Sequence, residues 1–210
     1  MNDGVAWLAR ENLTWLGYCV TLARGMEPEE LVRRLSGDEA PEELGDHGAE
    51  ELVGFLARRD RDRGRGDSVA VRYGTSGDLS FAVAYGQWPG SVGPGCTDGL
   101  SVRDDHVFQL SYETQNPKLP PPEFNYFRDG VHVCGFQMYM HTWSHEITGL
   151  RPELLSDAVQ AVGIPDEDDR DAAHAKSLAV VEQAFRLTLP RDRLLHQAVP
   201  AALIKGQTPA

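Results

Sequence analysis

The side chains best suited to chemistry gather in one short stretch, residues 138–146, with the sequence MYMHTWSHE. If residues 140–146 form a helix, His141 and His145 occupy positions i and i+4 on one face, which is the spacing of paired metal ligands. Zinc sites take three or four protein ligands, so at least one more would have to come from elsewhere. The candidates for it are His106, His132 and Asp105.

The two histidines do not form a zinc-protease motif, because the acid, Glu146, follows the second histidine instead of the first. Two other interpretations compete with metal binding: a pocket for a non-metal ligand, and a structural sheet edge near Trp143. We expect no metal and no cofactor, and we retain His141, His145 and Glu146 as candidate catalytic residues.

A second candidate nucleophile is Cys96, in the glycine-rich loop GPGCTDG. A reactive cysteine needs a histidine that lowers its pKa and backbone amides that stabilise an oxyanion, and the sequence indicates only the histidines. Paired acids for acid–base chemistry are also present, but such pairs arise by chance among 32 acidic residues. They are Glu113, Glu123, Asp104 and Asp105. The chain lacks GxSxG, GxxxxGK(S/T) and a GxGxxG before a helix, so hydrolase, P-loop and dinucleotide sites are unsupported.

Aromatic residues suggest a different kind of site, a concave sheet face that binds a hydrophobic ligand or a peptide. More often, such residues simply form the core of a half-covered sheet. The candidate ligand-binding residues are Trp88, Tyr112, Tyr126, Tyr139 and Trp143.

These residues lie in or beside a predicted central hairpin, residues 123–140. Asp129-Gly130 between two β-rich runs is the strongest short-range signal for a two-residue type I′ turn. This turn would pair Phe127 with His132, Tyr126 with Val133, and Asn125 with Cys134. Both faces of the hairpin are largely apolar, so we expect it to be covered on both sides over part of its length.

The remaining pattern predicts an α+β fold with an antiparallel sheet of about five to six strands, and with helices packed on one face and at the C-terminus. Expected strands include residues 16–22, 69–73, 79–85 and 108–112; expected helices cover residues 28–36, 48–59, 152–162, 172–187 and a short segment after Pro190. Loops are expected at residues 38–47 and 58–65, the latter as an arginine-rich linker. Residues 1–204 are predicted to be one domain and residues 205–210 a flexible tail.

Composition narrows the functional class. The formal net charge of −12 argues against nucleic acid and against an anionic membrane surface. We expect neither a signal peptide nor a membrane-spanning helix. Three cysteines without CxxC spacing favour free thiols and a cytoplasmic location, with Cys19 and Cys134 buried on strands. Ten of the acidic residues fall in residues 27–51, which we interpret as a solubilising face.

Several segments resemble a family of actinobacterial proteins of unknown function, over most of the chain. They are WLGYCVTLARGMEPEELVRRLSGD, LSFAVAYGQWPGS, FRDGVHVCGF, GLRPELLSDAVQAVGI and VEQAFRLTLPRDRLL. The resemblance implies a bacterial cytoplasmic single domain and carries no site residues. We therefore expect a binding or regulatory protein, for example an immunity-like module, with a protein or peptide partner or a small hydrophobic ligand. The alternative is a small enzyme of specialised metabolism with a pocket near His141 and His145.

Overall fold

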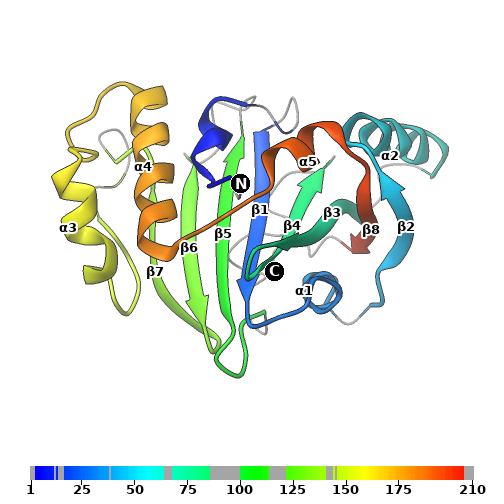
Figure 1. Ribbon diagram of the computed structural model, residues 1–210, viewed down its shortest axis with the longest axis horizontal. Coiled ribbons are helices and arrows are strands. Elements are labelled where there is room, and N and C mark those ends of the chain that lie inside the picture. Colours follow the sequence, from blue (N-terminus) through cyan, green and yellow to red (C-terminus); the bar gives the residue numbers. More distant parts are fainter. Residues whose placement is uncertain are drawn as a thin grey trace.

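The chain forms a central β-sheet with helices on both faces (Figure 1). The computed structural model describes residues 3–11, 13, 17–37, 39–63, 68–85, 100–113, 122–140, 144 and 146–205. The strands are β1 (Gly17–Arg24), β2 (Glu42–His47), β3 (Ser68–Ser76), β4 (Leu79–Tyr85), β5 (His106–Glu113), β6 (Glu123–Arg128), β7 (Val131–Gln137) and β8 (Val199–Lys205). The helices are the 3₁₀ helix η1 (Ala6–Ala9), α1 (Pro28–Leu35), α2 (Ala49–Arg63), α3 (Glu153–Ala161), α4 (Arg170–Phe185) and α5 (Arg191–His196).

The sheet has the strand order β2-β8-β3-β4-β1-β5-β6-β7, and every described pairing is antiparallel. The expected antiparallel sheet is confirmed, but the expected number of five to six strands is wrong, because the sheet has 8. One missed strand is β8, which contains Pro200, a residue rarely found in the interior of a sheet. The proline is tolerated because it pairs only with Asp46 of β2, and pairing with β3 begins at Ala201.

The other missed strand is β2, which lies in the acidic segment that we expected to be a loop. Its charged side chains, including Glu42 and Glu43, are exposed, and its register shifts between Glu43 and Gly45. Charge and irregularity at a sheet edge oppose pairing with further strands, which explains why so polar a sequence occupies this position. The arginine-rich segment also differs from the expectation of a linker, since α2 continues through it as far as Arg63.

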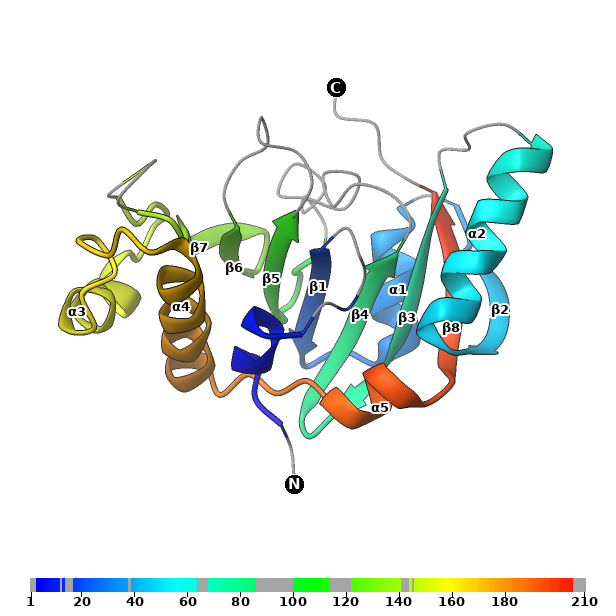
Figure 2. The same ribbon diagram turned by 90° about the horizontal axis from the view of Figure 1, so that it is seen from above.

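Helices cover the two faces unequally. One face packs against α1, through Leu31, Val32 and Leu35. The opposite face carries the larger core, to which η1, α2, α3, α4 and α5 all contribute (Figure 2). The expectation that the helices share one face is therefore wrong for α1. The main contacts of α1 with the sheet are with β3, β4 and β8, so α1 lies chiefly over that half of its face, and β7 lies at the opposite end of the strand order from β2 and β8.

The β6–β7 hairpin turns at Asp129 and Gly130, as the sequence predicts. Both residues have positive φ angles, 50° and 72°, which a type I′ turn requires. The predicted pairing of Phe127 with His132 is confirmed, but the next two predicted pairs are wrong. A β-bulge at Val133 shifts the register by one residue, so that Cys134 faces Tyr126 and Gly135 faces Asn125.

Cys19 on β1 and Cys134 on β7 are buried and belong to no disulfide, which confirms the expected packing role. Burial raises the pKa of Cys134 to about 12, so its thiol stays protonated and unreactive at neutral pH. Among the described residues, no helix is both long and apolar enough to cross a membrane.

Candidate functional site

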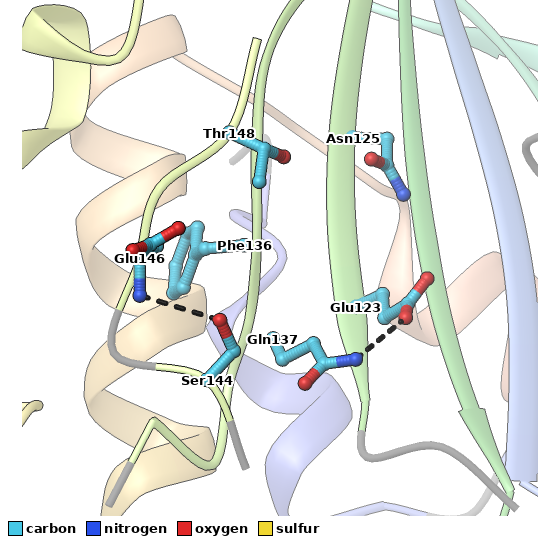
Figure 3. Close-up of a pocket in the computed structure, with 7 residues that line it drawn as sticks. All are labelled: Glu123, Asn125, Phe136, Gln137, Ser144, Glu146 and Thr148. Carbon is cyan, nitrogen blue, oxygen red and sulfur yellow. Dashed lines mark hydrogen bonds between the residues drawn. The ribbon is translucent and has the colours of Figure 1, made fainter.

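A polar pocket lies beside the β6–β7 hairpin, at the end of the sheet away from the strands that α1 mainly contacts. Its volume is about 170 Å³. It lies between β6, β7 and the segment that follows β7 (Figure 3). The seven lining residues are Glu123, Asn125, Phe136, Gln137, Ser144, Glu146 and Thr148.

The β-bulge determines which side chains meet in this pocket. Without the register shift, the predicted pairing would continue so that Glu123 faced Phe136. With the shift, Glu123 faces Gln137, and the Gln137 amide donates a hydrogen bond of 3.3 Å to the Glu123 carboxylate. Thr148 joins the pocket lining from the segment that follows β7, because its backbone exchanges two hydrogen bonds with Gly135, of 2.8 and 3.0 Å. The polar side chains of the pocket thus come from three adjacent backbone segments: β6, β7 and the segment around Thr148.

Gly135 allows this arrangement because it has no side chain. A Cβ atom at this position would lie 2.4 Å from Asn125 Oδ1 and 2.8 Å from both His132 Nε2 and the Phe124 carbonyl oxygen. These distances are far below van der Waals contact, so Asn125 and His132 occupy the space that a side chain would fill. The glycine therefore brings the amide of Asn125 close to the backbone at the side of the pocket.

The electrostatic character of the pocket is acidic and rich in hydrogen-bond acceptors. Glu123 and Glu146 supply two carboxylates, and none of the seven lining residues is basic. The one described aromatic lining residue, Phe136, packs its ring against Phe124 at 6.2 Å between centroids, within the core of the other face. The pocket is thus suited to a ligand that donates hydrogen bonds, and less to an apolar one.

His132 lies against Gly135, as Asn125 does, and one of its ring nitrogens makes no hydrogen bond within the described structure. Its Nε2 atom is buried and has no hydrogen-bond partner among the described residues. Burial lowers the pKa of His132, while a hydrogen bond to the backbone of Cys134 acts in the opposite direction. The imidazole is therefore neutral at physiological pH, and one of its nitrogen atoms is left without a partner next to the pocket.

The comparisons with known proteins identify a family for this chain but no individual relative. One family model matches residues 3–194, and its description is a family of unknown function. The chain belongs to the DUF6461 family. The comparisons with curated proteins and with solved structures gave no match. The resemblance drawn from the sequence is thereby confirmed at family level, and this membership assigns no role to any residue.

A second polar group in this DUF6461 protein lies on the opposite face, beneath α4. The Tyr18 hydroxyl and His174 Nε2 are 2.6 Å apart, and the rings of Tyr112 and Tyr139 lie 4.7 and 6.4 Å from the His174 ring. Burial lowers the pKa of His174 to about 4 and raises the pKa of Tyr18. Because Tyr18 and His174 are each only 3% exposed, this group joins α4 to the sheet and does not present itself to a ligand.

The structure separates the predicted aromatic binding residues. Tyr112 and Tyr139 belong to the group under α4, whereas Tyr126 lies elsewhere, stacked on Phe108 at 4.7 Å and bonded through its hydroxyl to His106 at 2.7 Å. All three pack on the same core face as α4, so the described aromatics do not form an open concave surface. Trp88 and Trp143 lie outside the described residues.

The predicted catalytic and metal-binding residues divide in the same way. Glu146 lines the pocket, and its catalytic role stays a prediction; His141, His145 and Cys96 lie outside the described residues. Ser144 and Glu146 are described and are not helical, which removes support for a helix through this stretch. No group of three metal-ligating side chains occurs within the described ranges.

The three candidates for an additional metal ligand do not converge. Asp105 binds Arg34 at 2.8 Å, His106 binds Tyr126, and His132 lies against Gly135 on the other face of the sheet. Each side chain thus has a structural environment of its own in this DUF6461 protein.

Sequence reasoning missed most of the pocket. It considered Glu123 only as one acid among many, and it singled out neither Gln137 nor Thr148. A usable signal was present in β6, where the polar residues Glu123 and Asn125 alternate with apolar ones in a strand expected to be covered on both faces. Gly135 gave a second signal, since glycine inside a strand often marks a close approach of other groups.

Proposed function

We propose that this DUF6461 protein is a binding or regulatory protein that recognises a small polar ligand in the β6–β7 pocket. The observation that supports the proposal is the convergence of six polar side chains, from three adjacent backbone segments, on one cavity. Ligand sites are typically concave and contain a few placed polar groups. The polar lining favours a hydrogen-bonding ligand over the hydrophobic one suggested by the aromatic residues. The odd number of cysteines, two of which are buried and belong to no disulfide, suits the cytoplasm.

The alternative, a small enzyme, has one observation in its favour. Ser144 and Glu146 line the pocket, and they flank His145 in the sequence. A carboxylate and a hydroxyl in one cavity are groups that general acid–base catalysis can use. The binding proposal is preferred because the described lining combines these groups with no paired nucleophile and base.

A thermal-shift screen with a library of small polar molecules tests the proposal. A ligand at 100 times its dissociation constant stabilises the folded state by about 2.7 kcal/mol, which corresponds to a rise in Tm of roughly 5–10 °C for a chain of this size. The test variant is Ser144→Phe, because a phenyl group at this position fills the cavity. The matched control is Ala161→Phe, which adds the same group at an exposed position on α3.

A compound that stabilises the native chain and the control, but not the Ser144→Phe variant, supports the proposal. Compounds that stabilise all three proteins equally, or a library without any stabilising compound, would overturn it.

A further inference from the structure

The lining of the β6–β7 pocket also indicates what chemistry its ligand must have. This inference rests on the proposed binding function and adds the class of ligand. Carboxylates accept hydrogen bonds and donate none, and Glu123 and Glu146 therefore add only acceptors and negative charge. The Gln137 amide, one of the few donors, is already directed to Glu123. The Thr148 hydroxyl is likewise directed to the Gly135 carbonyl oxygen, at 3.3 Å.

The two carboxylates also lack a cation in the described surroundings. The nearest arginines along the chain are engaged elsewhere: Arg128, five residues from Glu123, pairs with Asp104 at 2.8 Å, and Arg151, five residues from Glu146, pairs with Glu153 at 2.8 Å. Glu123 is half-buried and held by the cross-strand bond from Gln137, so its charge is partly removed from water and fixed in place. A partly desolvated carboxylate interacts more strongly with a cation than one that is fully exposed.

Size limits the ligand further. A volume of about 170 Å³ equals that of five or six water molecules in the liquid, at roughly 30 Å³ each. This space takes a ligand, or the end of one, with about the same number of non-hydrogen atoms. We propose that the β6–β7 pocket binds a small organic ammonium compound, whose N–H donors contact the Glu123 carboxylate and the Asn125 side chain, which lie on the same side of the pocket (Figure 3).

The experiment titrates the full chain with three molecules of the same length and different head groups: n-butylammonium, n-butanol and n-butyrate. Binding is followed by the ¹H–¹⁵N NMR signals of Gly135, Gln137 and Thr148. We expect n-butylammonium to shift these signals, and n-butanol and n-butyrate to leave them unchanged. Glu123→Gln keeps the shape of the side chain and should weaken ammonium binding about tenfold, the loss expected for one hydrogen bond to a charged group.

The matched control is Asp157→Asn, which removes one negative charge from an exposed position on α3 and should leave binding unchanged. Equal weakening by Asp157→Asn would show that only net charge attracts the cation, and it would overturn the inference. Shifts caused by n-butanol or n-butyrate, but not by n-butylammonium, would overturn the ligand class while the binding function stands. The binding function itself fails only if the library screen also gives no ligand that depends on the pocket.

Discussion

Arg72 allows the energetics of the fold to be tested at a single side chain. It is 0% exposed, on β3, and its guanidinium donates hydrogen bonds to the carbonyl oxygens of Leu194 and Gln197, at 2.8 and 2.6 Å. A further bond of 3.1 Å reaches the Tyr85 hydroxyl. These contacts hold the end of α5, and the turn that leads into β8, against the sheet. The positive charge also suits the C-terminal end of a helix.

Replacing Arg72 by methionine retains the apolar stem and removes all three donors. The Leu194 carbonyl and the Tyr85 hydroxyl are then left buried without this donor, at a cost of about 1–3 kcal/mol each. Gln197 is exposed, so its carbonyl can bind water instead. Removing a buried charge offsets part of the loss, because the Arg72 Nε atom is itself without a partner in the described structure. The expected net loss of stability is about 2–4 kcal/mol.

Urea unfolding, followed by far-ultraviolet circular dichroism, measures this difference. Tyr85→Phe is the matched control, since it removes one acceptor and leaves the guanidinium in place; it should cost about 1 kcal/mol. An Arg72→Met protein that is as stable as the native chain, or more stable, would refute the reasoning. It would mean that burying the guanidinium costs more than its hydrogen bonds return.

Three further predictions concern the site, the helix α4 and the thiols. Gly135→Ala should lower the free energy of unfolding, measured in urea, by about 1–3 kcal/mol, because the new Cβ collides with backbone and side-chain atoms. Gly48→Ala is the control and should change this free energy little, because a Cβ at Gly48 meets no atom within 4 Å. Equal effects of the two substitutions would contradict the packing described. The pKa of His174 is lowered from 6.5 to about 4, so between these pH values only the unfolded state takes up a proton. The free energy of unfolding should therefore fall by about 3 kcal/mol as the pH falls through this window. The His174→Gln variant should lack this pH dependence, and an identical pH profile for both proteins would refute the assignment. In a Cys96→Ser variant, labelling of the two buried thiols by a bulky maleimide should be slow in the native state and fast in urea, and fast native labelling would show that they are accessible.

The sequence predicted those parts of the fold that depend on local signals. The Asp129-Gly130 turn, the period-two strands and the capped helices are specified by neighbouring residues, and they appear where expected. The edge strand β2 could not be recognised, because its polar sequence has no apolar alternation and becomes a strand only through pairing with β8. Tertiary pairing of this kind overrides local propensity.

The candidate site was predictable only in outline. The stretch from Glu123 to Glu146 does supply six of the seven lining residues, but the expectation that its hairpin is central is wrong, because β7 is an edge strand of the sheet. The grouping of Glu123 with Gln137 depends on the bulge at Val133, and the sequence does not indicate where a bulge occurs. The approach of Thr148 to Gly135 is likewise a tertiary contact that no local pattern specifies.

The most direct test of the central claim is to locate the bound ligand. The strongest compound from the thermal-shift screen is added to isotope-labelled protein, and its contacts are mapped by intermolecular nuclear Overhauser effects. The account predicts contacts to the protons of Asn125, Gln137 and Thr148, and their loss in the Ser144→Phe variant. Contacts confined to another surface, such as α3 or the β2 edge, would contradict it.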